Sequence, residues 1–526
     1  MWLTWNQMVV TFVLASLPTG GRSVGSAGTD FITAFMENVA YFYPGVPVHK
    51  LLLSALRDGT QVNVTVGERA FETSYRMNTG QTQEVSLPPW VELNKFKSSN
   101  KTVRVSSNLP VTVLSVSRKT RSMDTSVVQP LQNLGKQYHV PSPPAPTDRF
   151  YQFIVINTED ANTVTVSQSP RKPTEVTLGP YDTAQFRSAL YPESTEVTAK
   201  KPVAVLFGHP CSEAEGCSCS LAFEQLAPVS HWGTAFMVPA LSVSSTVNQS
   251  LLLVASDGTD PESLLPSGAV TEVVTAAPAS VSLLRPGLIT LIPEEHFSAC
   301  YLLHTFQGFQ NFALVVVKTA DREGVQLRDQ PLPSVSWTAV DTTHYSVGLV
   351  TLGSASSHLL IWHLTSKMAV YMFAGDSEIS FGSPALSLKV EPDGSRCRVY
   401  HGEVTLVQEQ KSWTEAAAHC EAVGSRLASF NSDALLQEVG QELRGAGPSA
   451  AWLGLRRSLM SAEWRWLSRE RLAVSYWGKG EPNGSLITQC AMMSLEPASM
   501  LTWSTAKCCD KWPFICFLPG TDFPFP

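Results

Sequence analysis

The sequence predicts a multidomain protein in which an array of all-β, sandwich-like repeats is followed by a smaller α+β domain. Its 526 residues are too many for one hydrophobic core, and 44% hydrophobic with 16% charged residues indicates globular domains. Short period-two runs such as 61–66 and 163–166 fill residues 28–385, where long helical patterns are absent. Beyond them, 413–423 and 432–445 show apolar residues at helical spacing, with Asn431 or Ser432 as N-cap of the second helix.

The first residues predict a secretory signal. An apolar run from Met8 to Leu17 precedes small residues, which is the order of a signal peptide, although the usual basic residues are absent. No later segment has the ~20 apolar residues that span a bilayer, and the final FLPGTDFPFP lacks a lipid-anchor signal. We therefore expect a secreted, extracellular protein without a membrane span.

The cysteines, asparagines and net charge agree with this route. Ten cysteines suit an oxidising compartment in which most are paired. A net charge of -7 argues against a nucleic-acid partner, which is bound through basic patches. Asn-x-Ser/Thr triplets predict glycosylation at Asn63, Asn100, Asn248 and Asn483.

An internal repeat organises the β region. Residues 84–117 align with 175–209, and each copy runs from EV(S/T)L to a strand with Pro-Val-x-Val-Leu. Pro110 and Pro202 are expected where the last strand of each copy begins, because a missing N–H is tolerated there. Repetition of a strand unit predicts duplicated β modules, three or four in number.

Two segments near the first copy carry their own signals. Arg118-Lys119-Thr120-Arg121 has the spacing of a proprotein-convertase cleavage signal, although such basic turns are more often only solvated charges. The proline-rich 140–148 predicts a stiff linker. The predicted boundaries are 1–27 for the signal peptide and a short N-terminal segment, 28–139 for the first β module, 140–148 for the linker, 149–385 for further β modules, 386–396 for a second linker, 397–518 for the α+β domain and 519–526 for a tail.

Residues 397–518 resemble a C-type lectin-like domain. The features that carry the resemblance keep their order throughout: Trp413, Cys420, Leu427-Ala428, Trp452-Leu453-Gly454-Leu455, Trp464, Trp466, Trp477, Gly480-Glu481-Pro482-Asn483, Cys490, Trp503, Cys508 and Cys516. The resemblance implies disulfides Cys420–Cys516 and Cys490–Cys508, which would close the loops of a loop-rich fold. Cys397 and Cys509 remain, and we expect them to pair with each other, a link to another chain being the alternative.

The same resemblance bears on calcium and sugar. Sugar-binding members hold calcium through the Glu-Pro-Asn loop, often with a cis proline, a glutamate two residues before the cysteine matched by Cys490, and a later Asn-Asp pair. This chain keeps Glu481 and Asn483 but has Thr488, Ser504 and Thr505 at the other positions. Hydroxyls are weak neutral ligands, so we expect no cofactor and no metal. The alternative is a calcium-dependent carbohydrate-binding lectin that uses Glu481 and Asn483.

Residues 200–241 resemble the N-terminal domain family of the IgG Fc-binding protein of mucus secretions. The resemblance extends over 28–385, and its distinctive features are Cys211, Gly216-Cys217, the EQLAP stretch at 224–228 and Trp232-Gly233. It implies a secreted module that binds extracellular proteins, with immunoglobulin or mucin components as candidate partners.

Three clustered cysteines in this segment also invite a zinc hypothesis. Cys211, Cys217 and Cys219, close to His209, lack a usual zinc spacing, so disulfides are the better interpretation. With Cys300 they allow three pairings, and a bond from Cys300 to one of them would join distant strands.

No catalytic motif accompanies these features. The sequence has no His-Glu-x-x-His, no Gly-x-Ser-x-Gly and no phosphate-binding glycine loop, and His231, His296 and His344 lack acidic partners at suggestive spacing. The sequence therefore predicts a non-enzymatic, calcium-independent glycoprotein that recognises extracellular proteins or glycoproteins. The expected contact face surrounds Trp477, Glu481, Asn483 and Trp503, unless the two tryptophans belong to the core.

Overall fold

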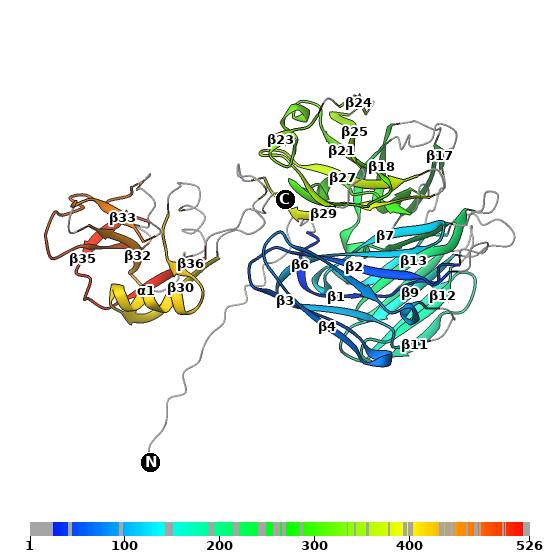
Figure 1. Cartoon of the computed structure of the whole chain (residues 1–526), viewed down its shortest axis with the longest axis horizontal. Helices are drawn as coiled ribbons and strands as arrows, with labels where there is room; N and C mark the ends of the chain where they lie inside the picture. The colour runs from blue at the N-terminus through cyan, green and yellow to red at the C-terminus, as the bar shows by residue number, and fades with distance from the viewer. Residues whose placement is uncertain are drawn as a thin grey trace, which may run out of the picture. The chain divides into compact units, whose positions relative to one another are not determined.

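The computed structural model divides the chain into two compact units, one ending at Cys397 and one spanning Arg398 to Asp522 (Figure 1). Each unit is described by itself. The residues described are 25–39, 45–93, 98–142, 151–188, 194–213, 220–239, 249–255, 263–265, 270–283, 288–333, 335–340, 343–353, 357–376, 379–392, 397, 403–430, 436, 443, 448–458, 461–467, 472, 475–496, 499 and 501–518. Most of the predicted signal peptide and the predicted tail 519–526 therefore lie outside the described residues.

The first module is a β-sandwich whose two sheets share one long strand, β6. The amino-terminal half of β6 pairs with β1 and β3, and its carboxyl-terminal half pairs with β2 and β7. Alternating buried side chains from the shared strand and its neighbours fill the space between the sheets. The strands are β1 (Gly28–Thr33), β2 (Val48–Ala55), β3 (Thr60–Val66), β4 (Phe71–Met77), β5 (Thr82–Leu87), β6 (Val103–Lys119) and β7 (Ser122–Val128).

The second module repeats this plan strand for strand. Its long strand β13 pairs with β8 and β10 through one half and with β9 and β14 through the other. Figure 1 shows the two modules side by side, and a separate apolar cluster joins them. The strands are β8 (Gly135–Val140), β9 (Gln152–Asn157), β10 (Asn162–Gln168), β11 (Thr174–Leu178), β12 (Thr183–Arg187), β13 (Thr195–Glu213) and β14 (Ser220–Gln225).

This arrangement confirms duplication but corrects three details of the predicted repeat. Pro110 and Pro202 lie inside β6 and β13, where the partner strand changes, and not where a strand begins. The EVSL of the first copy lies on β5 and the EVTL of the second on β11, which matches β4, so that part of the alignment is displaced by one strand. The module boundary lies near Pro130 and not at 139, because β8 pairs with β13 of the second module.

Two further modules complete the N-terminal unit and share one apolar core. The long strand β18 again pairs with β15 through one half and with β16 and β19 through the other. β29 pairs with β20, so 386–389 belong to the last module and not to the predicted second linker. The strands are β15 (Gly233–Val238), β16 (Gln249–Ala255), β17 (Ser263–Leu265), β18 (Thr271–Leu283), β19 (Ile289–Thr290), β20 (Cys300–Thr305), β21 (Gln310–Lys318), β22 (Gln326–Leu327), β23 (Gln330–Pro331), β24 (Trp337–Ala339), β25 (Tyr345–Gly353), β26 (Ser357–Trp362), β27 (Met368–Gly375), β28 (Ser380–Pro384) and β29 (Leu386–Lys389).

A recurring corner joins each module to the next. Pro130, Pro228 and Pro293 each precede one short 3-10 turn, η3 (Leu131–Asn133), η4 (Val229–His231) or η5 (Glu294–His296). The glycine that begins each of the first three modules, Gly28, Gly135 or Gly233, lies against the proline of the following corner. A Cβ on Gly135 would be 2.3 Å from Cβ of Pro228, and one on Gly233 would be 2.3 Å from Cβ of Pro293. Glycine is therefore required because the proline ring leaves no room for a Cβ there.

Individual hydrogen bonds, most of them accepted by side chains, join the four modules into a ring. From β7, Ser122, Asp124 and Ser126 accept hydrogen bonds from backbone N–H groups of β14, at 2.9, 2.9 and 3.0 Å. Glu224 on β14 accepts one from the N–H of Thr290 on β19, at 2.6 Å. The Ser26 N–H donates to the Ser387 carbonyl at 2.9 Å, which joins the chain before the first module to the last module.

The C-terminal unit is an α+β domain, as predicted. Its sheet has the order β30-β36-β32-β34-β35, and Ser412 with Glu415 forms a capping box on its helix. Of the second predicted helix, 432–445, only Leu436 and Leu443 are described, and both are buried in the core; its proposed N-cap at Asn431 or Ser432 lies outside the described residues. Within the described ranges, no helix is both long and apolar enough to cross a bilayer. The elements are β30 (Glu403–Lys411), α1 (Trp413–Ala422), β31 (Arg426–Leu427), β32 (Ala450–Arg457), β33 (Trp464–Trp466), β34 (Cys490–Ser494), β35 (Trp503–Ala506) and β36 (Trp512–Leu518).

Candidate functional site

The loop that precedes β34 in the C-terminal unit carries the predicted calcium ligands. Backbone hydrogen bonds fix its base to β35: the N–H of Trp503 donates to the Tyr476 carbonyl at 2.7 Å, and the N–H of Gly478 donates to the Trp503 carbonyl at 2.9 Å. Gly480 and Gly484 have φ of +83° and +70°, which glycine adopts without strain. Between them the Glu481–Pro482 peptide is cis, as the resemblance implied.

Glu481 turns its carboxylate toward the strand that would carry the remaining ligands. Its Oε2 accepts hydrogen bonds from the hydroxyl and the N–H of Thr505, at 2.6 and 3.2 Å. The N–H of Asn483 donates to the same oxygen at 3.0 Å. Three donors therefore converge on an oxygen that would face the cation in a calcium site.

Asn483 is engaged in the same way. Its Oδ1 accepts hydrogen bonds from the hydroxyl of Thr488 at 2.7 Å and from the N–H of Ser485 at 3.1 Å. The structure thus brings together Glu481, Asn483, Thr488 and Thr505, whereas Ser504 makes no hydrogen bond to either ligand among the described residues. The hydroxyl protons of Thr488 and Thr505 occupy the acceptor oxygens on which calcium would depend. Across the described parts of the chain, no group of three or more His, Cys, Asp or Glu residues could hold a metal.

The outer surface of this loop differs from the predicted contact face. Trp503 is fully buried and belongs to the core, and Trp477 is half-buried against it with ring centroids 5.8 Å apart. The prominent side chains are instead Leu486 and Ile487, which are 80% and 66% exposed. Sequence reasoning missed them, although two neighbouring aliphatic residues within a polar loop were the available signal.

The predicted glycosylation acceptors have different surroundings. Asn100 and Asn483 are exposed. Asn63 is partly exposed on β3, and its Nδ2 donates to Glu72 Oε1 at 2.9 Å. Asn248 lies outside the described residues.

The disulfides confirm two predicted pairs and correct a third. Cys420 bonds to Cys516 and Cys490 bonds to Cys508, as predicted. The predicted Cys397–Cys509 bond is wrong: Cys397 is buried in the N-terminal unit and bonds to Cys300, and Cys509 is free and exposed. The pairing of Cys300, which the sequence left open, is therefore with Cys397 and not with the 211–219 cluster. Cys211 is disulfide-bonded, while Cys217 and Cys219 lie outside the described residues.

The basic stretch Arg118–Arg121 covers the end of β6 and the tight turn that leads to β7. Lys119 donates to the carbonyl of Asn38 and forms an ion pair with Glu92 at 3.3 Å. Arg118 lies over the ring of Phe309, 5.5 Å from its centroid. These contacts hold the stretch in a folded hairpin, whereas proteolysis requires an exposed and mobile segment.

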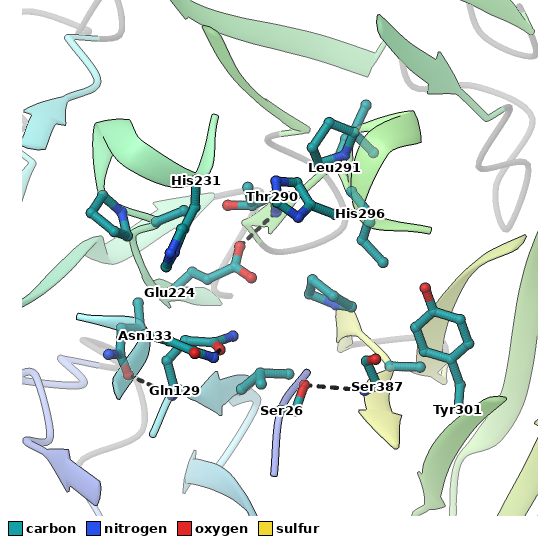
Figure 2. A pocket seen from close by; sticks show the side chains of 18 residues that line it. Ser26, Gln129, Asn133, Glu224, His231, Thr290, Leu291, His296, Tyr301 and Ser387 are labelled. Atoms are coloured by element: carbon teal, nitrogen blue, oxygen red, sulfur yellow. Dashed lines mark hydrogen bonds between the residues drawn. The ribbon is translucent and has the colours of Figure 1, made fainter. Parts of the chain in front are cut away.

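A second site lies in the N-terminal unit, where the corners of the modules meet around a cavity of about 130 Å³ (Figure 2). The repeated corner places four residues at equivalent positions, two before Gly28, Gly135, Gly233 and Ser298, and all four line the cavity: Ser26, Asn133, His231 and His296. Sequence reasoning treated the histidines as scattered, because the corner repeat that brings them together was not recognised.

Burial controls the charge of this cavity. Glu224 is buried, which raises its pKa to about 8 despite the hydrogen bonds from Thr290. Burial lowers the pKa of both His231 and His296, whose ring centroids are 6.4 Å apart. At neutral pH the carboxyl group is therefore protonated and the imidazoles are neutral.

Comparison with known proteins gives each unit a separate relationship. The family model for the IgGFc binding protein matches residues 124–270, and that for the lectin C-type domain matches residues 409–517. Human IgGFc-binding protein is 25% identical over 483 residues, which cover 80% of this chain but only 9% of that protein. Human lithostathine is 21% identical, with a TM-score of 0.22, covering 24% of this chain and 90% of that structure.

A C-type lectin from Cerberus rynchops is 31% identical over 117 residues, which cover 21% of this chain and 73% of that protein. The lectin C-type model, at residues 409–517, lies within the C-terminal unit. The chain therefore belongs to the C-type lectin domain family through its C-terminal unit, while its N-terminal unit is similar to the IgGFc binding protein family over residues 124–270.

Proposed function

We propose that the protein is a secreted, non-enzymatic glycoprotein that binds extracellular proteins or glycoproteins without calcium. One observation carries the proposal: the acceptor oxygens of Glu481 and Asn483 are occupied by the hydroxyl groups of Thr505 and Thr488, at 2.6 and 2.7 Å. Calcium needs six to eight oxygen ligands, several of them charged. Here a divalent ion would have to displace these donors and would gain a single formal negative charge.

The surface left for recognition is apolar. Leu486 and Ile487 project from a loop whose backbone is fixed on both sides, because the guanidinium of Arg457 donates to the Gly484 carbonyl at 3.1 Å and Gln489 Nε2 donates to the Leu486 carbonyl at 2.8 Å. A rigid exposed aliphatic pair suits the centre of a protein interface, since little conformational entropy is lost on binding.

The partner class is supported by the relative that covers most of the N-terminal unit. Human IgGFc-binding protein has a name that states a ligand, the Fc region of immunoglobulin G, and 80% of this chain aligns with it. Immunoglobulin and mucin components are therefore the first partners to test. Secretion is supported by the apolar leader and by the disulfides, which form in oxidising compartments.

The alternative is a calcium-dependent lectin, which is favoured only by the retained Glu481 and Asn483 on a loop with a cis proline. Calorimetric titration of the full chain with calcium distinguishes the two. We expect no one-site binding up to millimolar calcium, and partner capture on immobilised immunoglobulin or mucin that EDTA leaves unchanged. Stoichiometric binding at millimolar or lower calcium, with EDTA-sensitive capture of mannose-type sugars, would establish the lectin instead.

A further inference from the structure

The ring closes without needing an acid at the position of Glu224. Glu224 lies four residues before Pro228, and the matching positions before Pro130 and Pro293 are Ser126 and Ile289. Glu224 accepts the Thr290 N–H through Oε2, which a neutral side chain could also do. The carboxyl group is therefore a particular property of this corner and not a requirement of the fold.

This carboxyl group lines a cavity that supplies no counterion. No lysine or arginine is among the described residues that line the cavity. Several walls are aliphatic, including Leu291, Ile292 and Pro293, with Val127 and Pro384 from other modules. In Figure 2 the carboxyl group of Glu224 lies beside His231 and points toward Thr290. A buried carboxyl group in such surroundings either holds a proton or pairs with a cation that enters.

A second group in the cavity is suited to the same ligand. The ring of His296 makes a hydrogen bond to the backbone of His231, while its Nδ1 is buried with no partner in the described part of the chain. Because a ring N–H is what donates to a carbonyl, Nδ1 is left with a lone pair that can accept a hydrogen bond. Gln225 Nε2 is likewise buried without a partner, so the protein alone does not satisfy the polar groups here.

We propose that this cavity binds a primary ammonium group on a short alkyl stem, with Glu224 as its counterion, His296 as a further acceptor and the aliphatic walls around the stem. A free alkylamine and a lysine side chain of a partner share this chemistry. The rim is reachable, because His231, Ile292 and Pro293 are only half-buried. The cavity lies within the N-terminal unit, so this proposal does not depend on whether the loop at Glu481 binds calcium.

The protonation state gives the site a distinctive pH dependence. Free Glu224 is protonated at neutral pH, since burial raises its pKa to about 8, so a cation must release that proton on binding. Asp124 and Tyr371 also face Glu224, and burial raises the pKa of both, which favours their neutral forms. His231 and His296 are neutral above their lowered pKa values and repel a cation only at acid pH. Affinity should therefore rise with pH up to about 8, where Glu224 is ionised.

Calorimetry of the full chain with n-butylammonium and its neutral analogue n-butanol tests the proposal. We expect the amine to bind at least tenfold more tightly than the alcohol at pH 8, and binding at pH 7 to release close to one proton, measured in two buffers of different ionisation enthalpy. Affinity should increase by about tenfold between pH 6 and pH 7, as expected for a single titrating group. Binding that is independent of pH, or equal for amine and alcohol, would overturn the proposal.

Glu224→Gln is the matched variant, since its amide oxygen can still accept the Thr290 N–H. It should weaken amine binding at least tenfold and leave the alcohol unchanged; undiminished amine binding would refute the site. If the variant fails to fold, the pH dependence of the wild-type protein decides. Nα-acetyl-lysine methylamide is the second probe: tighter binding than the free amine indicates a lysine side chain as the natural ligand, and tighter binding of the free amine indicates a small molecule. If neither binds, the proposal is wrong.

Discussion

The loop at Glu481 and the cavity at Glu224 are two acidic sites that differ in how far hydrogen bonds within the protein satisfy their polar atoms. At the loop, hydroxyls from the same domain satisfy both former ligands, and the exposed features are the aliphatic Leu486 and Ile487. At the cavity, the carboxyl group is buried without a cation, and His296 Nδ1 and Gln225 Nε2 lack partners among the described residues. The polar atoms of a recognisable motif can thus be satisfied within the protein, while a cluster that the sequence does not reveal keeps polar groups that a ligand can satisfy.

The largest expected effect concerns the side chains that hold the ring around the cavity. Asp124 accepts hydrogen bonds from the N–H groups of Phe223 and Thr125, both at 2.9 Å, and is fully buried. Asp124→Leu would leave these donors unsatisfied, at about 1–3 kcal/mol each, so we expect the free energy of unfolding to fall by about 4 kcal/mol. Urea titration of the full-length proteins, in which the unfolding of the N-terminal unit is followed, measures this change in the free energy of unfolding.

Asp124→Asn is the intermediate variant for this prediction, because the two N–H groups donate to different carboxylate oxygens and the single amide oxygen of asparagine can accept only one of them. It should cost about 2 kcal/mol, roughly half of the loss in Asp124→Leu, because one of the two N–H groups keeps its acceptor. An equal fall in the free energy of unfolding for the two variants would mean that the hydrogen bonds from β14 to the side chains of β7 contribute little to stability. The cavity would then lack the rigid frame that distinguishes it from the loop.

The second effect is a pH dependence that only the cavity should show. Burial raises the pKa of Glu224 from 4.5 to about 8, so the folded chain keeps a proton that the unfolded chain loses. The stabilisation is complete below pH 4.5 and is lost as the pH rises toward 8, at about 1.4 kcal/mol per unit. We expect wild type to lose about 3 kcal/mol more than Glu224→Gln between pH 5.5 and pH 8.

The histidines act with the opposite sign. Burial lowers the pKa of His231 and His296, so the unfolded chain binds protons that the folded chain excludes, and stability falls as the pH drops below about 6.5. Melting temperatures of both proteins from pH 5 to pH 8.5 separate the two branches. Glu224→Gln should flatten only the alkaline branch; parallel curves throughout would show that Glu224 already ionises at neutral pH.

The third effect tests whether hydroxyls alone keep the loop closed to calcium. Replacing Thr488 by Glu, Ser504 by Asn and Thr505 by Asp restores carboxylate and amide oxygens around Glu481 and Asn483. We expect one-site calcium binding at millimolar or lower concentration, at least tenfold tighter than wild type, measured by calorimetry. Thr505→Val alone, which removes the hydroxyl without adding a ligand, should leave calcium unbound. If the triple variant stays inert, something other than the lost ligands closes the site.

The sequence reveals the loop site but not the cavity, and the reason is physical. Ligand identity is local, so Thr488 and Thr505 could be compared with the family pattern residue by residue. The cavity depends on long-range register: Ser26, Asn133, His231 and His296 meet only because four modules close into a ring. The disulfides show the same contrast. Cys420–Cys516 could be predicted because it lies within one recognisable domain, whereas Cys300–Cys397 could not, because it depends on where the N-terminal unit ends.

The smallest effect concerns the exposed aliphatic pair of the loop. Leu486→Ser should weaken capture of an immunoglobulin or mucin partner several-fold, since burying a leucine contributes about 1.5–3 kcal/mol and the pair shares that contribution. The melting temperature should not change, because Leu486 is 80% exposed and packs against little of the domain. Val423→Ser, at a site 64% exposed next to α1, is the matched control and should leave capture unaffected. Equal capture by both variants in a surface-plasmon assay would place the partner surface away from the loop, so that this former ligand site would have neither a metal nor a partner to bind.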